Sequence, residues 1–167
     1  MQEHVILVDN NDNPLGIMEK MEAHKNAVLH RAFSVFLFNS KGDMMLQLRA
    51  TGKYHSGGLW SNACCGHPKP NETVVSAAER RLHEEMGIKC HLEQVSHHIY
   101  KTPFPNGLTE HEYLHILKGV TNTEPRINPE EADGWKWISI KQLYDDVRNH
   151  PEHYAEWFKI SLEKGMF

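Results

Sequence analysis

The sequence predicts an α+β fold, in which a mostly β chain holds one central helix and ends in helices. Three observations predict it. Short β-branched and aromatic runs, separated by turn residues, fill the first part of the chain. The apolar period changes to that of a helix over residues 72–86. A capping pattern at Ser139 then introduces a helical C-terminal segment. A mostly β order with one central helix and a helical tail favours the α+β class.

The N-terminal part of the sequence predicts two β-hairpins. The expected strands are residues 3–9, 15–19, 32–38 and 44–49. Turn chemistry separates each pair: Asn- and Asp-rich residues 10–14 in the first hairpin and residues 40–43 in the second. Residues 50–59 are rich in glycine and predict a loop.

A helix is expected from residue 72 to residue 86. Asn71 is its expected N-cap and Gly87 its expected C-terminal stop. Apolar side chains recur on one helical face at Val74, Val75, Ala78, Leu82 and Met86. This helix is the only long periodic segment in the middle of the chain, and it therefore predicts the central helix of the fold.

The C-terminal half predicts three more strands and two helices. The strands are expected around residues 88–100, 113–120 and 134–138, with a turn at residues 105–107 between the first two. Ser139 and Gln142 resemble a capping box that opens a helix. A final amphipathic helix is expected over residues 152–164.

Length and composition indicate one ordinary globular domain over residues 1–167. The chain has 40% hydrophobic and 24% charged residues, and no apolar run reaches the roughly 18 residues that span a bilayer. The N-terminus lacks the basic-then-apolar order of a signal peptide. Of three cysteines, Cys64 and Cys65 are neighbours, so we expect reduced thiols in a cytoplasmic protein.

The charge is distributed unevenly along the chain. The net charge of −4 argues against indiscriminate nucleic-acid binding. Residues 1–83 carry 9 basic and 8 acidic side chains, whereas residues 84–167 carry 9 basic and 14 acidic ones. We therefore expect an anionic ligand to be received by the first half. Thirteen histidines motivate a search for metal sites.

Residues 66–88 resemble the Nudix box. Gly66 is followed at the family spacing by Glu72, Arg80, the Glu84–Glu85 pair, Gly87 and Ile88. On a helix, Arg80 lies one turn from Glu84, and Arg81 lies one turn from Glu85. Such a carboxylate face binds Mg²⁺, which in turn grips a diphosphate. The resemblance implies a Nudix-type mixed β-sheet sandwich with a central Nudix helix and C-terminal helices.

Arg81 departs from the box, because Nudix hydrolases have a metal-binding Glu at this position. A cation there should weaken the metal cluster that activates water. An ordinary surface helix with salt-bridged charges is the alternative interpretation, and each such pair stabilises a helix by only tenths of a kcal/mol. The full pattern in register favours an altered Nudix scaffold.

The run Cys65-Gly66-His67-Pro68, with Glu110-x-Glu112 further along the chain, resembles type I isopentenyl-diphosphate isomerase, a Nudix-fold family of isoprenoid biosynthesis. The resemblance covers nearly the whole chain. It is carried by Glu19-Lys20 with His24, residues 29–34, Arg49-Ala50 with Lys53, the run Cys65-Gly66-His67-Pro68 and Glu110-x-Glu112. The implied reaction converts isopentenyl diphosphate into dimethylallyl diphosphate through a tertiary carbocation. Such a cation needs negative charge or an aromatic face and must not meet water.

The resemblance implies two proton carriers on opposite faces of the alkene. Cys65 is the candidate on one face, and Glu112, assisted by Tyr100, is the candidate on the other. Trp157 matches the family's aromatic residue, and an indole face can stabilise a desolvated cation by roughly 2 kcal/mol. Core packing is the alternative role for Trp157.

The resemblance also implies two cation sites and a diphosphate cradle. The ligands of the first site are His24, His30, His67, Glu110 and Glu112. Glu110 and Glu112 are two residues apart, so on a strand they share a face. This donor set suits Mn²⁺ or Mg²⁺, and its ligand types also accept Zn²⁺. A second ion, Mg²⁺, is expected to join the substrate diphosphate to Glu85. The expected cradle is Lys20, Arg49, Lys53 and Arg81.

Two rival functions remain open at the sequence level. One is a Nudix pyrophosphohydrolase, which Arg81 and the Cys65 and Glu110-x-Glu112 motifs disfavour. The other is a non-catalytic metal- or nucleotide-binding Nudix domain, which the presence of every expected acid, base and ligand disfavours. The expected partner is a small isoprenoid diphosphate, with no nucleic acid and no membrane. A monomer is the default expectation, and a homodimer is the alternative.

Overall fold

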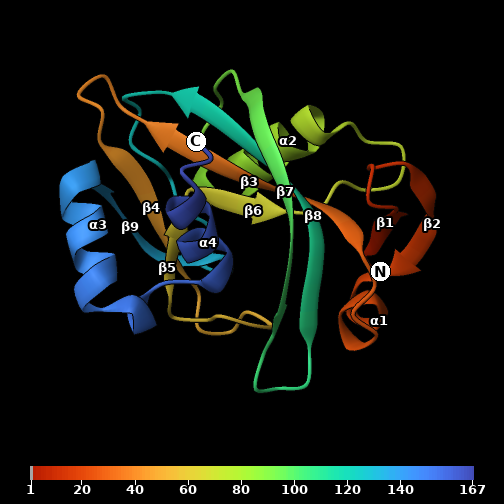
Figure 1. Cartoon of the computed structure of the whole chain (residues 1–167). Helices are drawn as coiled ribbons and strands as arrows, with labels where there is room; N and C mark the ends of the chain where they lie inside the picture. The colour runs from red at the N-terminus through yellow and green to blue at the C-terminus, as the bar shows by residue number, and fades with distance from the viewer. Residues whose placement is uncertain (1) are drawn as a thin grey trace.

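One mixed β-sheet, curled around its own centre, organises the chain (Figure 1). The computed structural model describes residues 2–167. In chain order the elements are β1 His4–Val8, β2 Pro14–Glu19, α1 Lys20–Lys25, β3 His30–Phe38, β4 Met44–Arg49, β5 Trp60–Asn62, β6 Cys64–Gly66, α2 Val74–Met86, β7 Glu93–Pro103, β8 Thr109–Val120, β9 Ala132–Ile138, α3 Ile140–Asn149, a 3₁₀ turn Pro151–His153 and α4 Glu156–Lys164.

Strand β3 lies at the centre of the sheet. It runs parallel to β8, with His30 opposite Glu112, and antiparallel to β6, with Ser34 opposite Cys65. It also pairs with β1 and β4 at its two ends. Strands β6 and β8 both pair with β3. This pairing brings Cys65 and Glu112, which are 47 positions apart in the chain, into one small region of the sheet.

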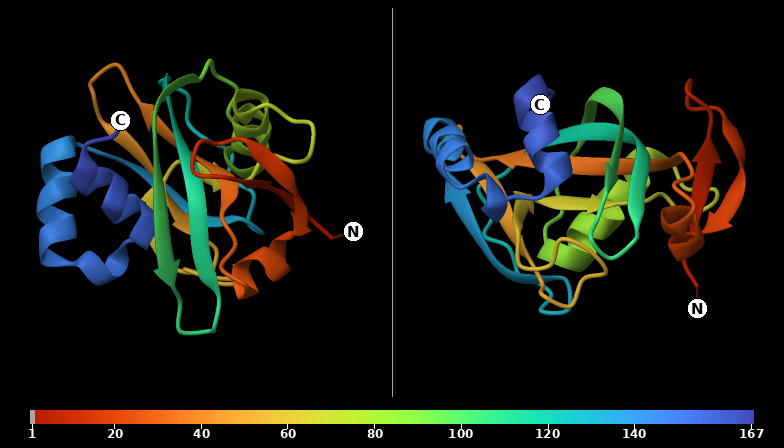
Figure 2. Two further views of the ribbon diagram at one scale, coloured as in Figure 1. Left: turned by 45° about the vertical axis from the view of Figure 1, so that its right-hand side comes forward. Right: turned by 60° about the horizontal axis from the view of Figure 1, so that its bottom comes forward.

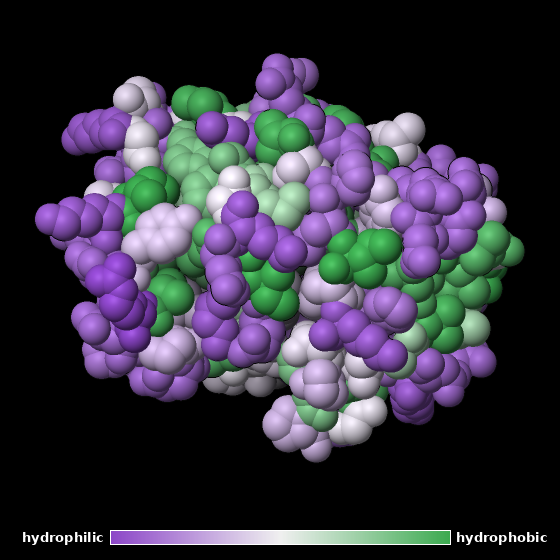
Figure 3. Space-filling model, in the orientation of Figure 1, coloured by the Kyte–Doolittle hydropathy of each residue, from purple (hydrophilic) through white to green (hydrophobic). Residues whose placement is uncertain are grey.

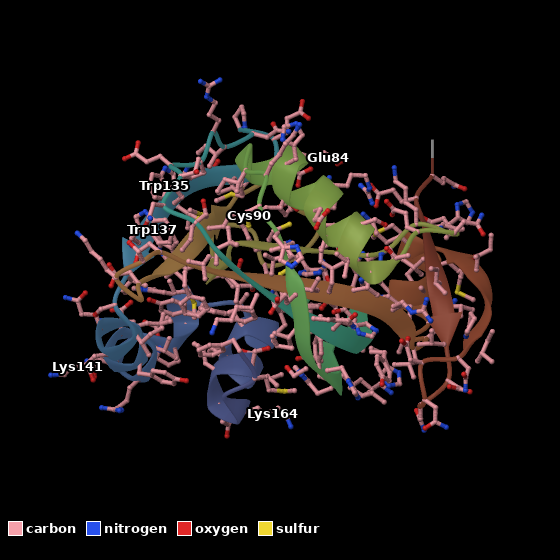
Figure 4. All side chains as sticks on the ribbon, turned by 90° about the horizontal axis from the view of Figure 1, so that it is seen from above. Glu84, Cys90, Trp135, Trp137, Lys141 and Lys164 are labelled. Atoms are coloured by element: carbon pink, nitrogen blue, oxygen red, sulfur yellow. The ribbon has the colours of Figure 1, made fainter. Side chains whose placement is uncertain are left out.

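Helices cover both faces of the sheet. Phe33, Val35 and Leu37 of β3 pack with Ala78 and Leu82 of α2 in one apolar cluster. The alternate β3 residues Ala32, Phe36 and Phe38 pack in a second cluster that includes residues of α4. This alternation follows from the strand period of two. Figure 4 shows the resulting layers, with Glu84 of α2 on one side of the sheet and Lys141 and Lys164 of α3 and α4 on the other.

The N-terminal hairpin β1–β2 and helix α1 form a unit at one end of the sheet (Figures 1 and 2). Helix α1 packs against β8, which places the buried His24 beside the end of that strand. In Figure 3 the hydrophilic surface is interrupted by an apolar patch over this hairpin, where Leu15 and Ile17 are exposed.

The predicted fold class is confirmed, and so is each predicted hairpin. Strands 44–49 and the 105–107 turn between β7 and β8 match closely. Strands β7 and β8 begin at Glu93 and Thr109, not at residues 88 and 113 as expected. The short helix α1 and the three-residue strands β5 and β6 were not expected, because six- and three-residue elements are too short to show a period.

The expected N-cap of the central helix was wrong. Thr73 caps α2 and accepts a hydrogen bond from the Ser76 amide at 3.1 Å. Asn71 instead has a positive φ of 71° in the preceding turn. Both residue types cap helices, so local chemistry alone did not distinguish them. Gly87 ends the helix in the left-handed conformation, as expected.

The expected continuous helix over residues 152–164 was also wrong. A 3₁₀ turn comes first, and α4 begins only at Glu156. The break is stabilised by the sheet, since the Ala155 amide donates a hydrogen bond to the Trp60 carbonyl at 2.9 Å. Ser139 caps α3 as expected, accepting from the Gln142 amide. In the described residues, no helix is both long and apolar enough to cross a bilayer.

Candidate active site

A cavity of about 540 Å³ opens between the N-terminal hairpin, the charged face of α2 and the loop of residues 50–59. Its lining combines apolar, thiol, carboxylate, imidazole and cationic side chains. The predicted site residues among the lining are Cys65, His67, Glu110, Glu112, Trp157, Lys20, Arg49, Lys53 and Arg81. One cavity therefore collects nine of the predicted residues from elements throughout the chain.

Cys65 faces this cavity, whereas Cys64 does not. Strand β6 alternates the two thiols across the sheet, so Cys64 packs in the α2 cluster with its Sγ 3.3 Å from Glu85 Oε2. The Cys65 Sγ lies 3.3 Å from Asn62 Oδ1 and 3.5 Å from Ser34 Oγ. Burial raises the pKa of Cys65 to about 12, and the hydrogen bonds that its Sγ makes with the Ser34 and Asn62 side chains offset this rise only in part. Cys65 is thus a protonated thiol at neutral pH.

Asn62 links the thiol to the indole of Trp157. Its Oδ1 accepts from the Cys65 thiol and, at 3.2 Å, from the Trp157 Nε1–H. Its Nδ2 donates to the Val35 and Cys64 carbonyls at 3.0 and 2.9 Å. Every polar atom of this buried amide has a partner, so Asn62 holds a fixed orientation. Sequence reasoning did not assign it a role, although it lies three residues before Cys65.

Glu110 and Glu112 project from the same face of β8, as their spacing predicted. His111 between them turns away, with its Nδ1 3.0 Å from the Ala27 carbonyl. The Tyr100 hydroxyl donates to Glu112 Oε1 at 2.6 Å and also contacts Glu110. Tyr100 is buried and is not among the residues that line the cavity, so it contacts the two carboxylates without bordering the cavity itself.

Three predicted imidazoles converge on these carboxylates. The Nε2 atoms of His67 and His30 lie 2.9 and 3.4 Å from Glu112 Oε2, and the Nε2 of His24 lies 3.7 Å from Glu110 Oε1. The Nδ1 atoms of His24 and His30 are bonded to the Lys20 and Val28 carbonyls at 2.7 and 2.8 Å. These bonds hold both rings in a fixed orientation, with each Nε2 directed at the carboxylates.

The donor set fits a divalent ion. The Nε2 atoms of His24 and His30 are buried, and neither has a hydrogen-bond partner among the described residues. Four of the five predicted ligands, His24, His30, His67 and Glu112, form one group of converging donor atoms. Glu110, the fifth, belongs to a second group that shares His24 and adds His55. His55 was not predicted.

The two carboxylates stay ionised despite their burial. Burial, and for Glu112 the neighbouring Glu110 charge, act to raise their pKa values. The surrounding imidazoles outweigh this effect, and the pKa of each carboxyl group lies below its ordinary value. Two buried negative charges in a nest of imidazoles are a favourable environment for a metal cation.

The four predicted cradle cations differ in how their charge is balanced. Arg81 pairs with Glu84 at 2.8 Å and with Glu85 and Glu131 at 3.2 Å each. Lys53 also pairs with Glu131, and Lys20 pairs with Glu3 at 2.8 Å. Arg49 is buried and forms no ion pair within residues 2–167. Its guanidinium lies 4.8 Å from the centre of the Trp157 ring and donates to the His55 carbonyl.

Glu85 is placed differently from the other predicted residues. It is 1% exposed and does not line the cavity; Arg81, Cys64 and Gln47 surround its carboxylate. The carboxylates near Arg81 that face the cavity are Glu84 and Glu131. The structure therefore contains the ion pair between Arg81 and Glu85 that the alternative role of Arg81 predicts.

Comparison with known proteins first identifies the domain family to which the chain belongs. The model of the NUDIX domain family matches residues 28–158. A protein of Deinococcus radiodurans, DR0079, superposes with a TM-score of 0.72 over 88% of this chain and 90% of its own, at 18% identity. The MutT protein of Methanosarcina mazei gives 0.68 over 81% and 91%, at 16% identity. The fold is that of a Nudix domain.

Curated relatives then define the particular family. Isopentenyl-diphosphate Delta-isomerase 2 of Aromatoleum aromaticum is 51% identical over 98% of this chain and 87% of its own. The isopentenyl-diphosphate Delta-isomerases of Serratia proteamaculans and Burkholderia multivorans are 48% and 46% identical, over 95% and 99% of this chain and 88% and 94% of their own. The chain belongs to the isopentenyl-diphosphate Delta-isomerase family of Nudix proteins.

Proposed function

We propose that the protein isomerises isopentenyl diphosphate to dimethylallyl diphosphate by moving protons on and off opposite faces of the alkene. The observation that carries this proposal is that Cys65 and Glu112 line one cavity together with the four expected cradle cations, Lys20, Arg49, Lys53 and Arg81. A Nudix scaffold alone does not imply this reaction, because function resides in the site. The names of relatives about half identical to this chain support the same activity.

The chemistry requires one proton to be added and another to be removed. Protonation of the terminal methylene carbon turns the alkene into a tertiary carbocation. Loss of a proton from the carbon on the other side of the cationic centre then forms the new double bond. The Cys65 thiol and the Glu112 carboxyl group, assisted by the Tyr100 hydroxyl, are the proposed proton carriers. Tyr100 acts by holding Glu112, since its hydroxyl bonds that carboxylate at 2.6 Å.

The walls of the cavity suit an intermediate that must not meet water. Trp157 and Phe33 line it, and both are buried. We propose that Trp157 contributes its indole to the stabilisation of the carbocation, while Asn62 holds the ring through Nε1. Arg49 lies over the same indole, so the charge of the diphosphate that it binds would offset its repulsion of the intermediate.

The diphosphate end of the substrate is proposed to lie among Lys20, Arg49, Lys53 and Arg81. Arg49 supports this most strongly, because a buried guanidinium without a carboxylate partner is costly unless an anion joins it. Of the four cations, it is the one whose charge no protein carboxylate balances among the described residues.

Divalent ions complete the proposal. Held by His24, His30, His67, Glu110 and Glu112, an Mn²⁺, Mg²⁺ or Zn²⁺ ion would supply positive charge that keeps both carboxylates ionised and oriented. A Mg²⁺ ion is proposed to accompany the diphosphate, with Glu85 as its protein contact. In this structure Glu85 faces Arg81, so that contact requires the Arg81–Glu85 pair to open.

Product analysis tests the proposed function. The protein is incubated with isopentenyl diphosphate and Mn²⁺ plus Mg²⁺, and the mixture is followed by proton and phosphorus NMR. We expect dimethylallyl diphosphate with no released phosphate. Release of phosphate, or of a monophosphate from a nucleoside diphosphate panel, would instead identify a hydrolase. Binding of substrate without any product would identify a non-catalytic domain.

A further inference from the structure

His55 is a buried imidazole in the candidate site that the sequence did not single out. It lies in the loop between β4 and β5, lines the cavity and is 6% exposed. Its Nε2 makes an ion-pair contact of 2.5 Å with Glu110 Oε1, and it has no hydrogen-bond partner among the described residues. A buried polar atom without a partner calls for a ligand or another explanation.

The ring is held firmly in place. It stacks on Phe104 with a centroid distance of 4.4 Å and an interplanar angle of 8°, and it meets the edge of Trp157 at 5.5 Å. Arg49 donates to the His55 carbonyl at 3.2 Å, and the Nδ1 atom lies 3.1 Å from Ser56 Oγ. These contacts fix the direction of Nε2.

His55 shares its pattern with two of the proposed metal ligands. In His24, His30 and His55 alike, Nδ1 has a polar neighbour and Nε2 is buried and unpartnered. All three Nε2 atoms face a carboxylate of Glu110 or Glu112. The donor atoms of His24, His55 and Glu110 lie within 4.8 Å of one another, so His24 joins this group to the first one.

We propose that His55 is a further ligand of the divalent ion, binding it on the side where Glu110 lies. The proposal rests on the metal site of the proposed function and extends it. One imidazole Nε2 has a single lone pair, so His24 can bind only one ion at a time, and we place that ion where the two groups meet at His24. Four imidazoles with two carboxylates favour Mn²⁺ or another transition ion over Mg²⁺, which prefers oxygen.

Replacement of His55 by Phe tests the proposal. His55→Phe keeps a ring that can stack on Phe104 and Trp157 but removes the nitrogen donor. Binding of Mn²⁺ is measured by competition with a fluorescent chelator, and nitrogen ligation is measured by pulsed electron paramagnetic resonance of the bound ion. We expect one ion per chain in both proteins, about 10–100-fold weaker Mn²⁺ binding in the variant, one fewer coordinated nitrogen and a smaller preference for Mn²⁺ over Mg²⁺.

His97→Phe is the matched control, because His97 is also a stacked imidazole, 5.2 Å from the Tyr113 ring, but lies outside the site. It should bind Mn²⁺ as the parent does. Equal affinity and equal nitrogen count in His55→Phe would overturn the proposal and leave His55 as a wall of the cavity. Two ions in the parent and one in His55→Phe would also overturn it, in favour of a separate site. A parent that binds no metal would refute the metal site of the proposed function itself.

Discussion

At the scale of single residues, the fold gives two neighbouring cysteines, Cys64 and Cys65, different surroundings. Cys64 and Cys65 are adjacent in sequence, yet one thiol is packed under α2 beside Glu85 and the other faces the cavity. Strand alternation alone produces this difference. Burial keeps the pKa of Cys65 high, so the thiol carries its proton at neutral pH. A thiolate would regain stabilisation from the Ser34 hydroxyl at 3.5 Å.

The cradle arginines give a first prediction at this scale. Arg49→Gln should raise the apparent KM for isopentenyl diphosphate by about ten-fold or more, since it removes the proposed charge-assisted contact to the diphosphate. Arg81→Gln should raise KM by a smaller factor, because Glu84, Glu85 and Glu131 already share its charge. Steady-state kinetics measures both effects.

Arg148→Gln is the control for the arginine variants, because Arg148 is an exposed residue of α3, and its KM should not change. An unchanged KM in Arg81→Gln would remove Arg81 from the cradle and leave it as a helix residue that pairs with Glu85. An unchanged KM in Arg49→Gln would mean that the diphosphate lies elsewhere.

At the scale of elements, Gly87 determines where α2, the Nudix helix, ends. Gly87 is in the left-handed conformation with φ +65°, and a Cβ there would lie 2.9 Å from both Cβ and O of Arg126. Any other residue at position 87 would therefore adopt an unfavourable backbone conformation, and its Cβ would also collide with Arg126. The Arg126 amide also bonds to the Met86 carbonyl at 2.8 Å, which ties the segment before β9 to the helix end.

A pair of glycine variants separates these two effects. Gly165 also caps a helix with φ +62°, but nothing lies within 4 Å of a Cβ built there. Gly165→Ala should cost about 1 kcal/mol of unfolding free energy for the backbone alone. Gly87→Ala should cost clearly more, because the Arg126 backbone must also move. Urea denaturation measures the unfolding free energy of both variants. Equal losses would show that Arg126 moves away from the new Cβ without a cost in stability.

How far the sequence could predict these elements depends on whether local or tertiary effects decide them. The shared face of Glu110 and Glu112 was predictable, because alternation along a strand is local. The break before α4 was not, because it depends on Ala155 bonding to Trp60, 95 residues earlier. His55 was not predictable either: its loop has no period, and only the fold brings it to Glu110.

At the scale of the whole molecule, the cavity joins the two halves of the chain. The four proposed cradle cations and the four proposed histidine ligands come from the first 81 residues, and Glu110, Glu112 and Trp157 come from the second half. The proposed position of the diphosphate follows the charge distribution, which predicts an anion beside the first half. The carboxylates of the acidic half then face the imidazoles across β3 and β8.

Removal of the metal tests whether the proposed ion stabilises the folded protein where the two halves of the chain meet. Because an ion bound only by the folded state stabilises it, saturating Mn²⁺ at about one hundred times its dissociation constant adds roughly 2.7 kcal/mol. For a chain of this length, that raises Tm by about 5–10 °C relative to the chelator-treated protein. Differential scanning calorimetry measures the shift. His30→Ala should show a much smaller rise, and an equal Tm with and without Mn²⁺ would contradict the metal site.

The two-sided transfer of protons is tested most directly by deuterium incorporation from D₂O during turnover. NMR of the parent reaction should show dimethylallyl diphosphate labelled in a methyl group, and Cys65→Ala and Glu112→Gln should each lose nearly all of this labelled product while circular dichroism shows an intact fold. Normal turnover by Cys65→Ala would remove the thiol from the reaction, and normal turnover by Glu112→Gln would do the same for the carboxylate.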